Sequence, residues 1–95
     1  MSPKPSETLA EHRNDVRRRI LERGFENPML FGSAARGDDV EGSDIDLLVT
    51  PCEGTGLLAL SGLALDLEEL LGVRVDLVSS RAGLADAVRH EAVPL

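Results

Sequence analysis

The spacing of hydrophobic residues along the chain predicts two principal helices. Leu9, Val16 and Ile20 recur at helical intervals and predict an amphipathic helix over residues 8–23. A denser series of leucines follows the same period over residues 57–71 and predicts a second helix with a buried face. Each segment is followed by a glycine, which is a common signal for the end of a helix.

Shorter apolar segments between and after these helices predict strands. Residues 29–32 and 44–50 are two such segments, and residues 73–78 alternate between an apolar face and a mixed one. Residues 80–95 predict a short terminal helix that includes Leu84 and Glu91. The series predicts an α/β (α+β) fold in which a short mixed sheet of about three strands is flanked by helices.

Length and composition fit one small domain. We expect a flexible leader at residues 1–7 and a single domain over residues 8–95. Aromatic residues make up only 2% of the chain and the net charge is −7, which argues against direct nucleic-acid binding. A single cysteine, Cys52, cannot form an internal disulfide, and no signal peptide or bilayer-length apolar run is present. We therefore expect a cytoplasmic protein with no membrane attachment.

Two surfaces each allow two interpretations. The first helix carries a basic face formed by Arg13, Arg17, Arg18, Arg19 and Arg23. This face is either solvated and paired with acidic residues of the same helix, or a docking surface. Leu58, Leu63 and Leu65 widen the apolar stripe of the second helix, so that either both flanks are covered or some leucines contact a partner.

The strongest chemical signal is a pair of carboxylates two residues apart. In an extended strand Asp44 and Asp46 point to the same face, where their negative charges repel each other. A divalent cation between them would remove this repulsion, and magnesium prefers such oxygen ligands. The pattern therefore predicts a metal site on this strand.

A second signal precedes the carboxylates by about ten residues. Gly32 and Ser33 follow a short apolar strand and predict a tight turn into a short helix, where free amides can bind an anion. A phosphate site near a metal site suggests a nucleoside triphosphate bound as its magnesium complex. The intervening loop carries Asp38, Asp39 and Glu41, whose glycine-flanked setting predicts solvent exposure.

These residues resemble a known family signature. Gly32-Ser33, ten intervening residues and then Asp44-Ile45-Asp46 are similar to the motif of the DNA polymerase beta-like nucleotidyltransferase superfamily. The longer string GSAARGDDVEGSDIDLLV and the ending HEAVPL resemble its smallest branch, the minimal nucleotidyltransferases, which are often antitoxins paired with a HEPN toxin. The resemblance covers nearly the whole chain.

The resemblance implies a role for each residue of the site. Asp44 and Asp46 would bridge two Mg²⁺ ions, and Asp76 would be the third carboxylate, next to the acceptor. Gly32 and Ser33 would hold the phosphates of ATP that leave as pyrophosphate. For Arg36 two roles stay open: it either adds positive charge near those phosphates or fixes the acidic loop by a salt bridge.

The resemblance also implies an acceptor and a partner. Similar antitoxins transfer AMP to a tyrosine of the cognate HEPN toxin, which would make this chain part of a hetero-oligomer. One alternative is a non-catalytic antitoxin or binding module that neutralises its partner by occlusion. Another is a small-molecule transferase, although those enzymes usually carry a further acceptor-binding domain.

Overall fold

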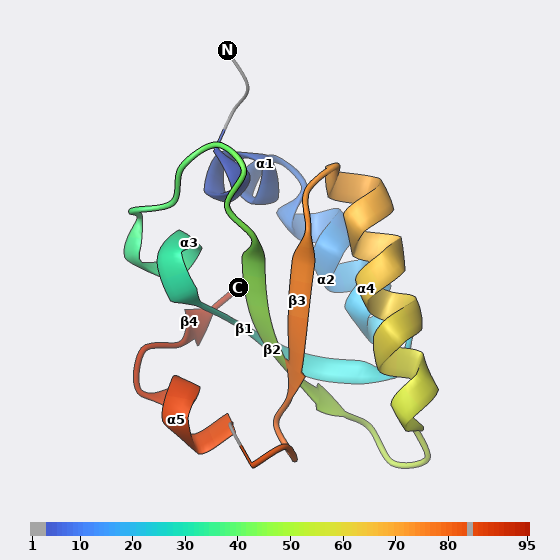
Figure 1. Cartoon of the computed structure of the whole chain (residues 1–95). Coiled ribbons are helices and arrows are strands. Elements are labelled where there is room, and N and C mark those ends of the chain that lie inside the picture. The colour runs from blue at the N-terminus through green and yellow to red at the C-terminus, as the bar shows by residue number, and fades with distance from the viewer. Residues whose placement is uncertain (1–3, 84) are drawn as a thin grey trace.

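The computed structural model describes residues 4–83 and 85–95. Within them the chain forms, in order, α1 (Pro5–Glu11), α2 (Arg13–Glu22), β1 (Phe25–Phe31), α3 (Gly32–Arg36), β2 (Ile45–Pro51), α4 (Leu57–Leu71), β3 (Val75–Ser79), α5 (Ala85–Arg89) and β4 (Val93–Pro94) (Figure 1). The strands form one mixed sheet in the order β3-β2-β1-β4. β2 and β3 are parallel, whereas β1 is antiparallel to β2 and to β4. The predicted architecture is confirmed, with four strands in this sheet where about three were expected.

The main core lies between the sheet and the helices α2 and α4. Alternate residues of β2, namely Ile45, Leu47 and Val49, are fully buried. They belong to one hydrophobic cluster with Ile20 of α2 and Leu67 of α4. Burial of these branched aliphatic side chains supplies the main driving force for folding in a chain with two aromatic residues.

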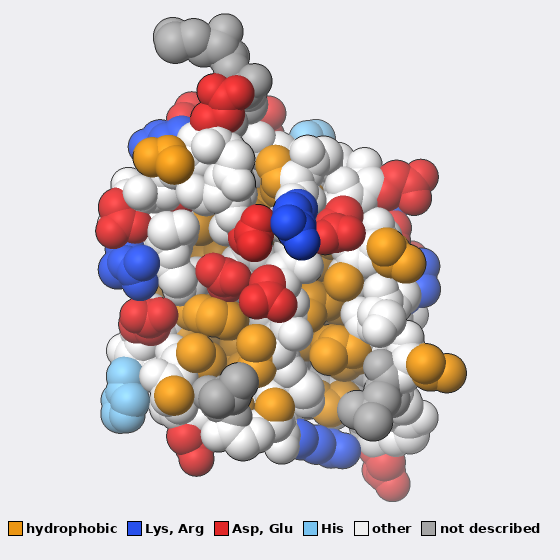
Figure 2. Space-filling view, in the orientation of Figure 1, with side chains coloured by type: hydrophobic (Ala, Val, Ile, Leu, Met, Phe, Trp, Pro, Cys, Tyr) orange, Lys and Arg blue, Asp and Glu red, His pale blue; other side chains and the backbone are white. Residues whose placement is uncertain are grey.

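The opposite face of the sheet is covered over only part of its area. A smaller cluster there is formed by Phe31, Leu48 and Ala85, with partly buried side chains from α5 and the segment that follows it. Figure 2 shows acidic side chains gathered beside the apolar ones on the visible face. The ends of β2 and β3 beyond the small cluster are therefore accessible to a ligand.

The first helix differs from its predicted bounds. It begins at Pro5, so residues 5–7 of the expected leader are helical, while residues 1–3 lie outside the described residues. Proline suits this first position because the amide that it lacks would have no helical partner. The helix is also divided at His12 into α1 and α2. Leu9 and Val16 flank the division and are both buried, which is why their spacing concealed it.

The strand β1 and the end of the chain also differ from the prediction. β1 begins at Phe25 and continues through Asn27, which has a φ of 51°, with an irregular register that accommodates the proline at position 28. At the other end α5 stops at Arg89, and β4 pairs with β1 in place of a longer helix. Leu84, which the prediction placed in the terminal helix, lies outside the described residues.

The basic face of the first helix is largely occupied by ion pairs. Arg18 pairs with two acidic residues of its own helix. Arg19 and Arg23 both pair with Asp66 of α4 and thereby join the two helices that cover the sheet. Pairing within the same helix thus holds for Arg18, whereas Arg19 and Arg23 pair with α4 instead; both kinds of contact favour pairing within the protein over a docking surface.

The leucines of α4 fall into two groups. Leu63 is fully buried, whereas Leu58 is 89% exposed and Leu65 is 67% exposed. Both exposed leucines are therefore accessible to a partner protein. None of the helices in the described part of the chain has the length and apolar character needed to cross a membrane.

The acidic loop contradicts the expectation that its carboxylates are all exposed. Asp38 and Glu41 are exposed, but Asp39 is only 2% exposed. Its carboxylate accepts hydrogen bonds from the backbone amide of Ser6 at 2.8 Å and from the Ser6 hydroxyl at 2.9 Å. Burial by itself raises the pKa of Asp39, but the hydrogen bonds from Ser6, together with the positive charge of Lys4 and a backbone hydrogen bond, lower it overall. Asp39 therefore fastens the acidic loop to α1.

We expect Asp39→Asn to lower the free energy of unfolding by about 1–3 kcal/mol at pH 7, since charge-assisted hydrogen bonds to Ser6 are lost. Because the folded state lowers this pKa, the stabilisation is complete above the ordinary value of 3.8 and disappears as the pH falls through the folded value. Urea unfolding at several pH values measures both effects. Asp38→Asn, which removes an exposed neighbouring charge, should change stability by less than about 0.5 kcal/mol. Equal losses in the two variants would contradict the assignment.

Candidate active site

Three carboxylates lie at the accessible ends of β2 and β3. Asp46 of β2 is the register partner of Asp76 of β3, and neighbouring strands lie about 4.8 Å apart. Asp44 directly precedes β2, where the amide of Ile45 donates a hydrogen bond to the carbonyl of Arg74 at 2.9 Å. The structure therefore brings together the three acidic residues that sequence reasoning had selected.

The electrostatics of Asp46 are those of a crowded carboxylate. Partial burial raises the pKa of this group, and the negative charges of Asp76, Asp44 and Glu91 raise it further. Arg36 acts in the opposite direction but does not cancel these effects. The folded protein thus holds several like charges close together, which is unfavourable unless a cation binds among them.

The Gly32-Ser33 turn lies directly against this carboxylate. Gly32 has a φ of 74°, and a Cβ atom at this position would lie 2.2 Å from Oδ2 of Asp46. Only glycine permits both this backbone conformation and this close approach. Gly32 and Ser33 then begin the short helix α3, which is thereby fixed beside the carboxylate cluster. The two motifs that are about ten residues apart in the sequence consequently form one site.

Arg36 is at the end of α3 and makes two ion pairs. Its Nε lies 3.3 Å from a carboxylate oxygen of Asp38, which ties the acidic loop to α3. One terminal nitrogen of its guanidinium group lies 3.4 Å from Oε2 of Glu91. The other oxygen of Glu91, Oε1, accepts a hydrogen bond from the amide of Gly32 at 3.4 Å.

Sequence reasoning missed Glu91 because it assigned this residue to the terminal helix. Its place in the ending HEAVPL, itself part of the family resemblance, was the available signal. Its contact with Gly32 joins positions 59 residues apart, a separation that local patterns do not report.

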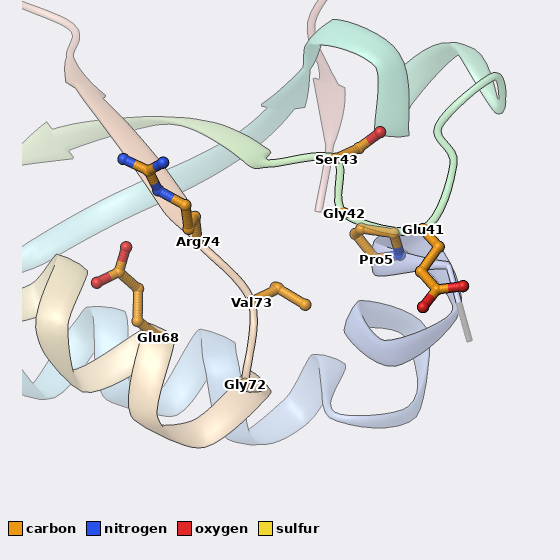
Figure 3. Close-up of a pocket in the computed structure, with 8 residues that line it drawn as sticks. All are labelled: Pro5, Glu41, Gly42, Ser43, Glu68, Gly72, Val73 and Arg74. Atoms are coloured by element: carbon orange, nitrogen blue, oxygen red, sulfur yellow. The ribbon is translucent and has the colours of Figure 1, made fainter. Parts of the chain in front are cut away.

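A cavity of about 670 Å³ lies among α1, α4 and the segments that lead into β2 and β3, and Figure 3 shows the side chains around it. The lining residues are Pro5, Glu41, Gly42, Ser43, Glu68, Gly72, Val73 and Arg74. Ser43 directly precedes Asp44, and Arg74 is two residues before Asp76 on the chain. Glu68 reaches from α4 to accept a hydrogen bond from the amide of Val75 at 3.0 Å. This volume is within the usual range for small-molecule sites, but none of the three carboxylates lines the cavity, so it is distinct from the carboxylate cluster.

The chemistry of the donor set fits a hard divalent cation. Asp44, Asp46 and Asp76 offer only carboxylate oxygens, which are the ligands that Mg²⁺ prefers. In residues 4–83 and 85–95 no group of three acidic, histidine or cysteine side chains is placed so that it could hold a metal ion as it stands. The side chains of the cluster would therefore have to turn toward a bound ion.

Comparison with known proteins gives consistent matches. Residues 9–93 match the family model of the nucleotidyltransferase domain. Protein adenylyltransferase MntA of Thermococcus cleftensis is 41% identical over 88 residues, which are 90% of this chain and 86% of that protein. A solved minimal nucleotidyltransferase has a TM-score of 0.83 and 47% identity over 95% of both chains. A crystal structure of a toxin-antitoxin with AMP-PNP has a TM-score of 0.65 and 29% identity, over 74% of this chain and 58% of that chain. The matched range, residues 9–93, spans the positions of the three carboxylates, the Gly32-Ser33 turn and Glu91.

Proposed function

Because this chain belongs to the nucleotidyltransferase-domain family, as a minimal nucleotidyltransferase, we propose that it transfers AMP from magnesium-bound ATP to a tyrosine hydroxyl of a HEPN toxin and thereby acts as its antitoxin. The relatives that support this proposal include a protein adenylyltransferase and a toxin-antitoxin crystallised with AMP-PNP. The observation that carries it is the close approach of Gly32 to Asp46, which places the Gly32-Ser33 turn against a carboxylate cluster.

Each residue of the cluster has a defined task in this proposal. Asp44, Asp46 and Asp76 would hold two Mg²⁺ ions, which when bound supply activation of the attacking oxygen and stabilisation of the leaving group. The amides of Gly32 and Ser33 orient the β- and γ-phosphates, and Arg36 adds positive charge beside them.

The transfer itself is a displacement at the α-phosphorus. The acceptor oxygen forms a bond to the α-phosphorus, the bond from that phosphorus to the bridging oxygen breaks, and pyrophosphate leaves. Asp76, on the strand at the edge of the sheet, accepts the proton of the acceptor hydroxyl. An exposed edge gives a protein acceptor room to approach, and the exposed Leu58 and Leu65 of α4 offer it an apolar contact.

The test uses the purified complex with the product of the neighbouring gene. It is incubated with Mg²⁺ and ATP that carries label at the α-phosphate or, separately, at the γ-phosphate. We expect the partner to acquire only the α-label, together with the mass of AMP on a tyrosine. Asp44→Ala/Asp46→Ala should abolish the labelling without dissociating the complex. A stable complex that carries no label with the wild-type chain would instead support neutralisation by occlusion.

A further inference from the structure

We propose that the carboxylate of Glu91 occupies the triphosphate subsite of this enzyme in the absence of nucleotide, and that binding of ATP displaces it. The inference rests on the proposed function, because the groups that Glu91 contacts are those assigned to the phosphates. In this arrangement the carboxylate of Glu91, from the segment between α5 and β4, competes with the phosphates of ATP for the same groups.

The contacts of Glu91 are those of an anion in an anion site. Oε1 accepts a hydrogen bond from the amide of Gly32 at 3.4 Å, and Oε2 lies 3.4 Å from the guanidinium group of Arg36. The two carboxylate oxygens thus use the same two donors, a backbone amide and a guanidinium group, that two oxygens of a phosphate would use. A bound triphosphate and Glu91 cannot both satisfy them in this arrangement.

The position of Glu91 is unfavourable with respect to the rest of the site. Its negative charge lies close to the like charges of Asp44, Asp46 and Asp76. Attraction to Gly32 and Arg36 therefore holds a fourth carboxylate where three others repel it. A triphosphate that arrives with its own magnesium would take over the attractive contacts and would also neutralise the carboxylate cluster.

Displacement of Glu91 requires movement of a side chain only. The backbone on its C-terminal side is fixed by the pairing of β4 with β1 and by burial of Leu95. On its N-terminal side α5 is anchored through buried Ala85. The side chains of Glu91 and Arg36 are 44% and 51% exposed, and contacts of 3.4 Å between exposed groups are weak. A change of rotamer therefore suffices to empty the subsite.

We would measure the affinity of the intact chain for magnesium pyrophosphate and for magnesium ATP by titration calorimetry. Glu91→Ala should bind both probes about threefold to tenfold more tightly than the wild type, since no internal anion has to leave. The matched control is Asp38→Asn, which also removes a charge paired with Arg36 but one that does not contact Gly32. It should change affinity by less than about twofold.

A second pair of variants tests whether Glu91 weakens nucleotide binding through its contact with Arg36. In an Arg36→Ala background, the further change Glu91→Ala should tighten binding less than it does in the wild type, because one of the two shared groups is already absent. Thermal unfolding confirms that each variant is folded.

Weaker or unchanged binding by Glu91→Ala would overturn the inference, and weaker binding would indicate a ligand to the metal instead. Equal tightening by Asp38→Asn would also overturn it, as would failure of both probes to bind any of the proteins. Tighter pyrophosphate binding by Glu91→Ala without AMP transfer to the partner would sustain the inference and reject the proposed function.

Discussion

Asp46→Asn should lose at least about a thousandfold in the rate of AMP transfer and yet give a more stable metal-free protein. The rate loss follows because metal ions held by such carboxylates contribute several kcal/mol to stabilisation of the transition state. The gain in stability follows from partial burial of Asp46 and from its three acidic neighbours, which raise its pKa. A group whose folded pKa is raised destabilises the folded state when it is ionised, and this cost disappears as the pH falls through the folded pKa.

Initial rates of label transfer test the first effect, and thermal unfolding in EDTA at pH 7 tests the second. We expect a stabilisation of a few tenths to about 1 kcal/mol, since the group is partly exposed, and no stabilisation below about pH 4. Glu53→Gln removes an exposed charge in the turn before α4 and should change neither quantity. A destabilised Asp46→Asn protein in EDTA would show that the carboxylates do not repel one another as described.

Gly32→Ala should lower the free energy of unfolding by about 2–4 kcal/mol and reduce AMP transfer more than a hundredfold. Part of the loss is backbone strain, because alanine at a φ of 74° costs about 1–2 kcal/mol. The remainder arises because the new Cβ would lie 2.2 Å from Oδ2 of Asp46, so that the turn or the carboxylate must move. Either movement displaces a group of the active site.

Gly37→Ala is the matched control for this prediction. Gly37 has a φ of 79° at the other end of α3, but a Cβ there would meet no atom within 4 Å. This variant should therefore show the cost of strain alone, about 1–2 kcal/mol, with transfer activity within a fewfold of the wild type. Denaturant unfolding and the label-transfer assay compare the two variants directly. Similar activity losses would mean that contact with Asp46 is not what makes glycine necessary at position 32.

The residues of the carboxylate cluster could be predicted from the sequence because each of them lies in a recognisable local pattern. The two-residue spacing of Asp44 and Asp46 fixes their common face on a strand, whatever the rest of the chain does. The alternation around Asp76 placed that residue on a strand in the same way. Its pairing with Asp46, however, could be expected only from the family resemblance, because register between separate strands is a long-range property.

The features that sequence reasoning missed depend on contacts between distant segments. Burial of Asp39 requires Ser6, 33 residues earlier in the chain, and the sequence of a glycine-flanked acidic loop does not predict that contact. The terminal residues pair with β1 as a strand because an edge of the sheet is available, although their local pattern also suits a helix. The break at His12 leaves the helical spacing of its flanking residues intact.

The place of β2 within the sheet has a consequence for how the site opens. β2 is hydrogen-bonded on both sides, and its alternate side chains are buried in the main core. Amide protons of such a strand exchange with solvent only through global unfolding, whereas a five-residue helix such as α5, at the end of the chain, opens locally at a lower free energy. The half of the site that carries Asp46 therefore stays intact for as long as the whole protein remains folded. The side chain of Glu91, which follows α5, can change rotamer many times within that lifetime, as repeated rounds of nucleotide binding require.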